Sequence, residues 1–209
     1  MYWHHRRSFS RRKDYKSNIN RAPRKKFFKI TKAINKGNGL KVLSKNFEMN
    51  NNLLSFKKHK SPIGQKIIIK GKVISRRGNP LKGTIIEIWQ ANAGGKYRHQ
   101  NDPSNIKLDE NFGGCGRFIT SSDGYYIFNT IEPGAYPYPN RGIEWRPKHI
   151  HFSLFGSMFL QRLITQMYFE GDPLIKSCPM VNSIPDTNAR KLLVGKLDLS
   201  KTDEERILG

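Results

Sequence analysis

The chain has 209 residues, and its 38 Lys and Arg against 16 Asp and Glu give a formal net charge of +22. This length is enough for one domain with a well-formed core, and no apolar run approaches the ~20 residues of a membrane-spanning helix. The basic N-terminus lacks the apolar stretch of a secretory signal, and two cysteines give no disulfide framework, so we expect a cytoplasmic protein.

The positive charge is concentrated at the start of the chain. Residues 1–64 hold 18 of the 38 basic residues but only 2 of the 16 acidic ones. Residues 1–60 are polar and without strong periodicity, so we predict a basic N-terminal arm followed by a domain at 61–209. One explanation of this charge is that the arm binds an acidic partner subunit, and another is that it only reflects a proteome rich in lysine. Nucleic acid is the weaker alternative, because no helix-turn-helix, zinc-finger or RNP-like pattern follows.

From Ser61 onward, short β-branched and aromatic runs alternate with turns rich in Gly, Pro, Asn and Asp. Six strands are predicted, at 66–75, 83–91, 116–121, 125–131, 148–156 and 163–171. Six short strands separated by turns indicate a mostly β protein, an antiparallel β-sandwich or barrel. A short C-terminal helix is predicted at 186–197, where Asp186 is a suitable N-cap and apolar residues follow at helical spacing.

Two histidines stand one residue apart in "WRPKHIHF". Alternate residues of a strand face the same side, so His149 and His151 present their imidazoles together while Ile150 faces the opposite layer. Such a pair can bind a metal, but an isolated H-x-H is more often an ordinary hydrogen-bonded pair. A zinc site would need more His or Cys, and a ferrous two-His site would need a nearby acid, which "HIHFSLFGSMFLQRL" does not contain.

Two tyrosines lie in glycine- and proline-rich loops beside predicted strands, Tyr97 in "AGGKYRH" and Tyr136 in "PGAYPYPN". Side chains on such loops can converge on a site. A phenolate is a hard anionic oxygen donor, and it suits a small, highly charged ion such as Fe(III). For each tyrosine alone, the favoured explanation is an aromatic that packs its ring and hydrates its hydroxyl.

Four longer stretches carry a family resemblance: "IKGKVISRRGNPLKGTIIEIWQANAGGKYRHQND", "NFGGCGRFITSSDGYYIFNTIEPGAYPYP", "WRPKHIHFSLFG" and "LITQMYFEGDPL". Over most of 61–199 they resemble the intradiol ring-cleavage dioxygenases, in particular the iron-bearing β subunit of the protocatechuate 3,4-dioxygenase type. The resemblance implies a β-sandwich fold, in agreement with the predicted strands. It also implies an enzyme of aromatic catabolism that cleaves protocatechuate, a small aromatic diol, with O₂ to 3-carboxy-cis,cis-muconate.

The resemblance assigns roles to individual residues by motif position. The Fe(III) ligands would be Tyr97, Tyr136, His149 and His151. Tyr136 would also act in catalysis, as a base that takes a proton from the diol, and Arg146 would be the cation near the reacting carbon. The remaining pocket residues would be Tyr15, toward the substrate carboxylate, and Trp89, Tyr138, Gln166 and Met180.

The sequence also departs from the family pattern. Tyr138 stands where the family usually has tryptophan, and Met180 where a branched aliphatic residue is usual, so we expect a shift in ring specificity. The family's β subunit continues into a further strand after the segment that corresponds to "KLDL", and we therefore expect a truncated C-terminus here. The resemblance implies a related α subunit as the partner of a hetero-oligomer. The alternatives are an inactive, assembly-only sandwich subunit and an intradiol dioxygenase for another catechol.

Overall fold

The computed structural model describes residues 2–5, 49–57, 60–100, 102, 104–138, 144–156 and 162–198. Its strands are β1 (Tyr2–His5), β2 (Lys66–Val73), β3 (Ile85–Gln90), β4 (Cys115–Ile119), β5 (Tyr125–Ile131), β6 (Tyr136–Pro137), β7 (Trp145–Arg146), β8 (His149–Phe155), β9 (Arg162–Phe169) and β10 (Val194–Gly195). Its helical elements are the 3-10 turns η1 (Leu53–Ser55) and η2 (Pro173–Ile175) and the helices α3 (Pro179–Asn182) and α4 (Thr187–Lys191). Within these ranges, no helix has the length and apolar character that crossing a membrane requires.

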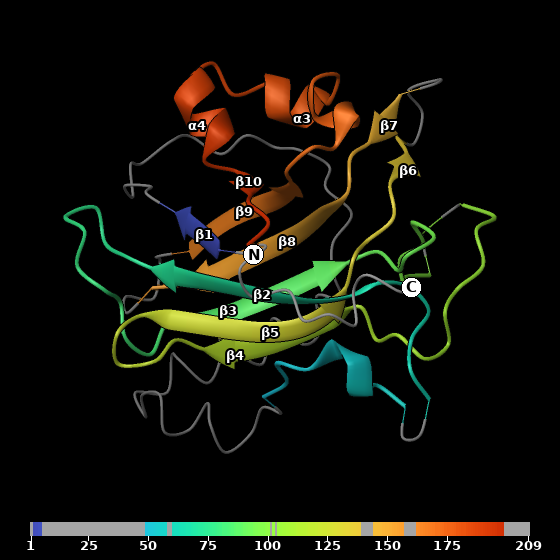
Figure 1. The fold of residues 1–209 in the computed structure, drawn as a ribbon, viewed down its shortest axis with the longest axis horizontal. Coiled ribbons are helices and arrows are strands. Elements are labelled where there is room, and N and C mark those ends of the chain that lie inside the picture. The colour runs from blue at the N-terminus through green and yellow to red at the C-terminus, as the bar shows by residue number, and fades with distance from the viewer. Residues whose placement is uncertain are drawn as a thin grey trace.

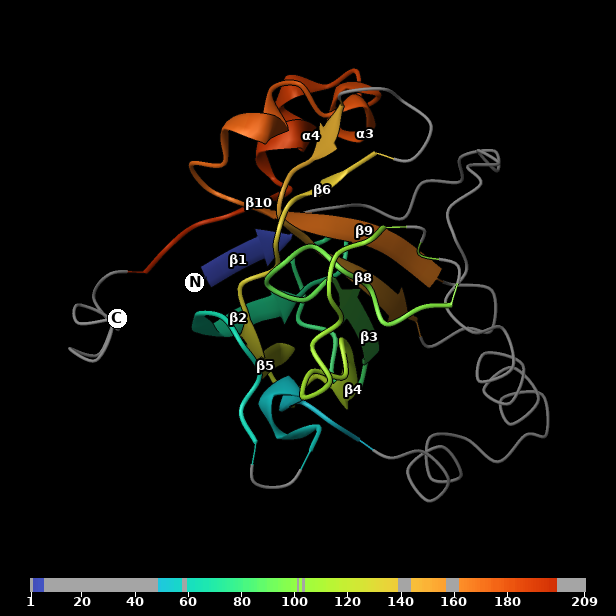
Figure 2. The same ribbon diagram turned by 90° about the vertical axis from the view of Figure 1, so that its right-hand side faces the viewer.

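The strands form two stacked sheets and a small ribbon. One sheet has the order β1-β2-β5, the other β10-β9-β8-β3-β4, and β6 pairs with β7. The six predicted strands are all present and pair antiparallel with one another, whereas the short β1 and β10 add in parallel. Figures 1 and 2 show the sheets as separate layers, with α3 and α4 gathered at one end beside β6. The predicted β-sandwich is therefore confirmed.

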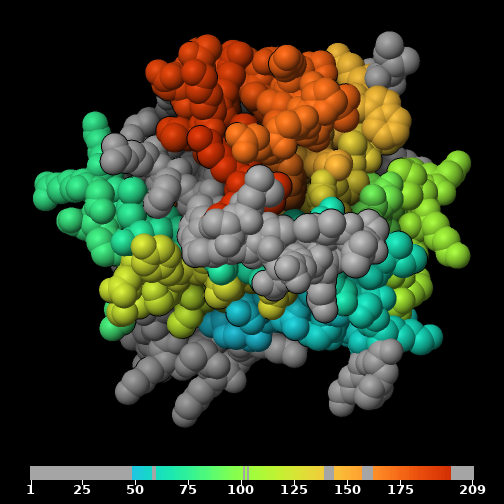
Figure 3. All heavy atoms as spheres, viewed as in Figure 1, coloured from blue at the N-terminus to red at the C-terminus, as the bar shows by residue number. Residues whose placement is uncertain are grey.

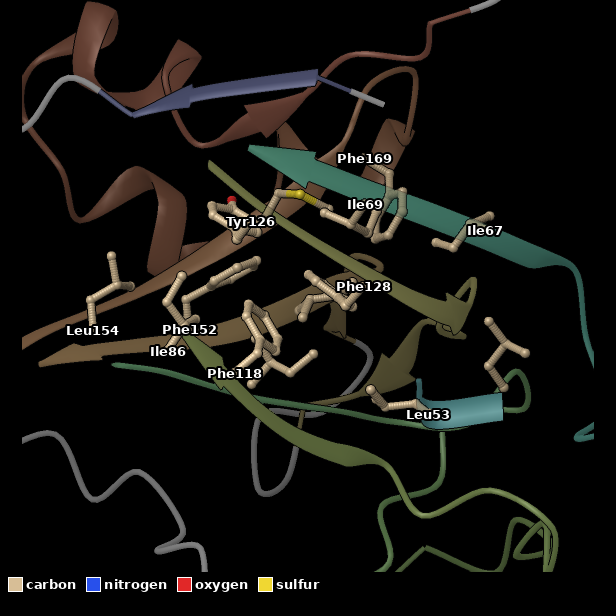
Figure 4. Packing of buried hydrophobic residues seen from close by; sticks show 14 of the residues in the cluster. Leu53, Ile67, Ile69, Ile86, Phe118, Tyr126, Phe128, Phe152, Leu154 and Phe169 are labelled. Carbon is tan, nitrogen blue, oxygen red and sulfur yellow. The ribbon is translucent and has the colours of Figure 1, made fainter. Parts of the chain in front are cut away.

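The core lies between the two layers because each strand has one apolar face. Burial alternates along β2 and β5, and the inward residues of β5 include Tyr126 and Phe128. Figure 4 shows these two rings pointing toward Phe118 and Phe152 of the other sheet. On β8, Ile150, Phe152 and Leu154 belong to this core. The period of two then leaves both histidines of β8 on the opposite face, as predicted.

A close approach across the β2–β5 pair requires a glycine. Gly71 is the register partner of Tyr126, and the phenol ring lies directly over it. A Cβ at Gly71 would stand 2.3 Å from the Cζ and hydroxyl atoms of Tyr126. Any larger residue would displace this ring, so the glycine lets an aromatic side chain fill the space that a strand glycine leaves open.

Residues 49–57 join the edges of the two sheets. Asn50 pairs with Arg117 on β4, and Asn52 pairs with Asn129 on β5. Leu53, which follows them in η1, is 1% exposed and belongs to the core. A short part of the segment assigned to the arm therefore packs against the sandwich. The division of the chain at residue 60 stays a prediction.

The C-terminal helix is shorter than predicted. Asp186 caps α4 as expected, since its side chain accepts hydrogen bonds from the backbone N–H groups of Asn188 and Ala189. The helix ends at Lys191, however, and the prediction of helix up to residue 197 was wrong. Leu193 is buried against β9, and its carbonyl accepts a hydrogen bond of 2.8 Å from the Tyr168 N–H. Pairing with the sheet edge thus outweighs the helical pattern of the sequence.

Candidate metal centre

The candidate site is built from three separate parts of the chain. His149 and His151 begin β8, Tyr136 begins β6, and Tyr97 lies in the loop that follows β3. Both histidines are buried, at 1% and 6% exposure. The loop of Tyr97 is fixed from within, because the Asp102 carboxylate accepts a hydrogen bond of 2.8 Å from the Tyr97 N–H and pairs with Lys96.

Two glycine-containing loops pack together and so bring the two tyrosines close. The Gly134 N–H donates to the Asn92 carbonyl over 2.9 Å. Gly95 has a φ of +89°, and a Cβ there would stand 2.3 Å from the Ala135 carbonyl oxygen. A residue with a side chain would be strained in this conformation and would force the loops apart. The glycines of "AGGKY" and "PGAY" are therefore needed to juxtapose Tyr97 and Tyr136.

The four predicted ligands meet around the Nε2 atom of His149. The Tyr97 hydroxyl lies 3.4 Å from this nitrogen, and the Tyr136 hydroxyl lies 3.3 Å from it. The rings of His149 and His151 have their centroids 4.8 Å apart, and the ring of Tyr97 is 6.3 Å from that of His151. Two phenol oxygens thus converge on one imidazole nitrogen, and the second imidazole lies beside it.

The histidines are held in the form that a metal ligand requires. The Pro147 carbonyl lies 2.6 Å from Nδ1 of His149, and because a carbonyl can only accept, Nδ1 carries the proton. Burial, aided by the positive charge of Arg146, lowers the pKa of His149 well below its usual value and that of His151 to about 3. Both imidazoles are therefore neutral at pH 7, and the Nε2 lone pair of His149 faces the phenols.

The phenols are not ionised by the protein alone. Burial is the main cause that raises the pKa of Tyr97 and of Tyr136, although Arg146 partly offsets the rise at both. A cation that binds both as phenolates must therefore displace both protons, and a high charge on the cation favours this. In the described ranges, no three His, Cys, Asp or Glu side chains gather into a metal-binding group. Hard oxygen donors with two neutral imidazoles fit Fe(III) better than a soft ion.

Arg146 places a positive charge beside these four side chains. It is 6% exposed, and its Nη2 donates to the Gln166 Oε1 over 2.5 Å. Burial by itself would lower its pKa, but the acidic groups of Tyr136, Tyr168 and Cys178 leave the pKa raised, so the guanidinium stays charged. Among the described residues, no carboxylate forms an ion pair with it. The charge is therefore not neutralised from within this part of the chain.

The structure also locates most of the predicted pocket residues. Trp89 stacks on His151, and Gln166 accepts a hydrogen bond from Arg146. Arg146 lies 5.7 Å from the centre of the Tyr138 ring, whose hydroxyl reaches the Met180 sulfur over 3.9 Å. Figure 3 shows the residues of α3 beside those of β6 and β7 on this face. Tyr15 lies outside the described residues.

Sequence reasoning missed Tyr168. It is buried on β9 directly opposite His149, and its hydroxyl donates to Gln166 over 2.8 Å. The alternation within "LITQMYFEG" puts Gln166 and Tyr168 on one face of the strand, and this signal could have identified it.

The fold and the side chains together define a class: a β-sandwich protein with two tyrosines, two histidines and a buried arginine at one site. A family model described as "Dioxygenase" matches residues 42–209, and the chain belongs to this family of intradiol dioxygenases.

Relatives of known activity agree with this assignment. The protocatechuate 3,4-dioxygenase beta chain of Burkholderia cepacia is 47% identical over 152 residues, which are 73% of this chain and 64% of that protein. Catechol 1,2-dioxygenase 1 of Acinetobacter lwoffii is 36% identical over 120 residues, 52% of this chain and 37% of that protein. The protocatechuate 3,4-dioxygenase alpha chain of Pseudomonas putida is 31% identical over 135 residues, 64% of either chain.

Among solved structures, catechol 1,2 dioxygenase of Acinetobacter radioresistens superimposes with a TM-score of 0.53 at 25% identity, over 75% of this chain and 49% of that one. The matched part of the chain thus spans less than two thirds of the length of each of these relatives.

Proposed function

We propose that this chain is the iron-bearing subunit of an intradiol dioxygenase that cleaves protocatechuate with O₂ to 3-carboxy-cis,cis-muconate. The observation that carries the proposal is the approach of the Tyr97 and Tyr136 hydroxyls to the same Nε2 atom of His149, at 3.4 and 3.3 Å, with His151 beside it. The 47% identity to a protocatechuate 3,4-dioxygenase beta chain supports this choice of substrate.

Tyr97, Tyr136, His149 and His151 would hold Fe(III). When bound, the ion would act as a Lewis acid that lowers the pKa of the catechol hydroxyls, and a deprotonated diol is electron-rich toward O₂. The remaining groups of the site belong to the chain itself, and their surroundings suit three tasks: accepting a proton, stabilising negative charge and orienting the ring.

Tyr136 is the residue best suited to accept a proton from the diol. Burial raises the pKa of its phenol, so its phenolate, once displaced from a cation, is a stronger base than an exposed tyrosinate. The proton would then rest on the Tyr136 hydroxyl oxygen. Tyr97, whose pKa burial also raises, would stay as the second oxygen ligand.

Arg146 would stabilise the negative charge that develops on the substrate. Its guanidinium is buried and keeps its charge, and a buried charge acts more strongly than one in water. Tyr138 and Met180, which contact each other across the face of the site, would border the substrate ring. Tyr15, in the basic arm, stays a prediction for the substrate carboxylate.

A related α subunit is the proposed partner, with the basic arm lying against it in a cytoplasmic hetero-oligomer. Support comes from the relatives, because the chain is similar to both a protocatechuate dioxygenase alpha chain and a beta chain, and is more similar to the beta chain.

The test is to express the chain with its α-type partner, load it with iron and measure three quantities: iron content, visible absorption and O₂ uptake on protocatechuate and catechol. We expect a coloured protein that consumes O₂ with protocatechuate. Tyr136→Phe should weaken and shift the tyrosinate absorption, because Tyr97 remains as a ligand, and Tyr97→Phe/Tyr136→Phe should abolish it. Tyr126→Phe, which changes a buried core tyrosine, should leave the absorption unchanged. A colourless protein that still binds iron would contradict the metal site. A coloured protein that consumes no O₂ with any diol would contradict the proposed activity and favour the alternative of an inactive, assembly-only subunit.

A further inference from the structure

Tyr168 forms a hydrogen-bonded triangle with Arg146 and Gln166. The Tyr168 hydroxyl donates to the Gln166 Oε1 over 2.8 Å and lies 3.5 Å from the Arg146 Nη2. That same Nη2 donates to the same Oε1 over 2.5 Å. Tyr168 is 2% exposed, and its ring centre is 5.8 Å from that of His149. Two members of the triangle, Arg146 and Tyr168, are therefore buried and Gln166 is half-buried, and the triangle touches the candidate metal site.

The partners in this triangle hold the guanidinium without neutralising it. The groups that face Arg146 are the amide oxygen of Gln166 and the phenol hydroxyl of Tyr168, and neither is a carboxylate. A carboxylate in their place would fix Arg146 equally well but would cancel its charge. A full positive charge is therefore kept in a fixed position beside Tyr136 and His149.

The hydrogen bonds of the triangle involve only the Nη2 group of the Arg146 guanidinium. Nη2 is engaged, whereas the Nε–H of Arg146 is buried and has no hydrogen-bond partner within the described part of the chain. Buried donors in folded proteins nearly always have a partner, and an exception calls for a functional explanation. An anionic oxygen of a bound molecule would satisfy this donor and the charge together.

We propose that Tyr168 is a positioning residue for Arg146, which holds Nη2 so that the Nε–H and the charge are available to an anionic oxygen of the substrate. This inference rests on the proposed function for the identity of that anion. The alternative is that Tyr168 only fills space beside His149, in which case its ring matters and its hydroxyl does not.

Tyr168→Phe separates the two roles because it keeps the ring. With the iron-loaded protein and its partner, we expect unchanged iron content and colour, a similar KM for protocatechuate and a kcat lower by about 10- to 100-fold, the usual effect of losing a residue that orients another. With the iron-free full chain, labelled with ¹⁵N at arginine, we expect the Arg146 Nε–H resonance, assigned by its absence in Arg146→Lys, to broaden or exchange faster.

Tyr126→Phe is the matched control, because it also removes a buried hydroxyl, one that has no partner in the described residues. It should leave the colour, kcat and the Arg146 resonance unchanged. The proposal is wrong if Tyr168→Phe leaves the Nε–H resonance as in the parent protein. If the parent itself consumes no diol, the proposed function fails, while loss of the resonance in Tyr168→Phe would still establish that Tyr168 positions Arg146.

Discussion

The indole of Trp89 lies flat on the imidazole of His151, with ring centroids 4.8 Å apart and planes 5° from parallel. The two residues are cross-strand partners on β3 and β8, so the sheet register sets this stack. His149 is oriented differently, by the hydrogen bond from its Nδ1 to the Pro147 carbonyl. One imidazole is thus held by ring packing and the other by a backbone acceptor.

The stack leads to a prediction about metal affinity. Trp89→Leu should release the His151 ring and weaken iron binding by about 10- to 100-fold, as loss of a residue that orients a metal ligand usually does. Trp89→Phe should keep most of the affinity, because a smaller ring can still stack. Competition with a coloured chelator measures the effect. Tyr125→Leu, a half-exposed aromatic on the other sheet, serves as control. Equal affinity in all three variants would argue against the stack as an orienting device.

Acid should destabilise the iron-free protein from about pH 6.5 downward. Burial lowers the pKa of both site histidines in the folded state, to about 3 for His151, while in the unfolded chain both titrate near their ordinary value of about 6.5. Below that pH the unfolded state binds protons that the folded state does not, so this contribution is complete above pH ~6.5 and is lost as the pH falls toward 3.

Urea unfolding between pH 8 and pH 5 measures this loss. The slope should reach about 1.4 kcal/mol per pH unit for each histidine. The double variant His149→Gln/His151→Gln should flatten the curve over this range. A parent and a double variant with the same pH dependence would show that other groups cause the acid sensitivity.

Gln90 should contribute strongly to stability. It is 1% exposed, its amide donates to the Ile131 carbonyl over 2.9 Å, and its Oε1 accepts from the Thr130 hydroxyl over 2.7 Å. These bonds join β3 of one sheet to β5 of the other. Gln90→Met keeps the volume but leaves a buried hydroxyl and a carbonyl unpaired, and should lower the free energy of unfolding by about 2–5 kcal/mol.

A double-mutant cycle with Thr130→Val tests this account. Thr130→Val removes one of the two orphaned groups, so the cost of Gln90→Met should be smaller in its presence. Chemical denaturation of the four proteins gives the coupling energy. Strictly additive effects would mean that the hydrogen bond between the two side chains contributes nothing.

Gly71→Ala should destabilise the sandwich by about 1–3 kcal/mol, the usual range for overpacking a core. Its new methyl group would stand 2.3 Å from the Tyr126 ring. Adding Tyr126→Leu should recover part of the loss in Gly71→Ala, because the overlapping ring atoms are gone. Thermal melting of the single and double variants provides the comparison. No rescue by the second change would point to backbone conformation instead of the ring.

The sequence alone predicted the β-sandwich and half of the site's layout. The period of two in "KIIIKGKV" and "YYIFNTI" reappears as alternating burial, because each strand has one face on the core. The same period put His149 and His151 on one face, and Asp186 was correctly identified as a helix cap. These features depend on residues close together in the chain, so local geometry is enough to determine them.

Tertiary structure decided the features that depend on distant segments. The Gly95 and Gly134 loops had to pack together before Tyr97 and Tyr136 could approach His149. Tyr168 came to lie opposite His149 only through the pairing of β8 with β9, and its contact to Arg146 joins β9 to β7. The C-terminal helix ends at Lys191 because the chain near Leu193 pairs with β9 at the edge of its sheet. The sequence determined which residues could serve as donors, but loop packing and strand register, which are long-range, determined which of them meet.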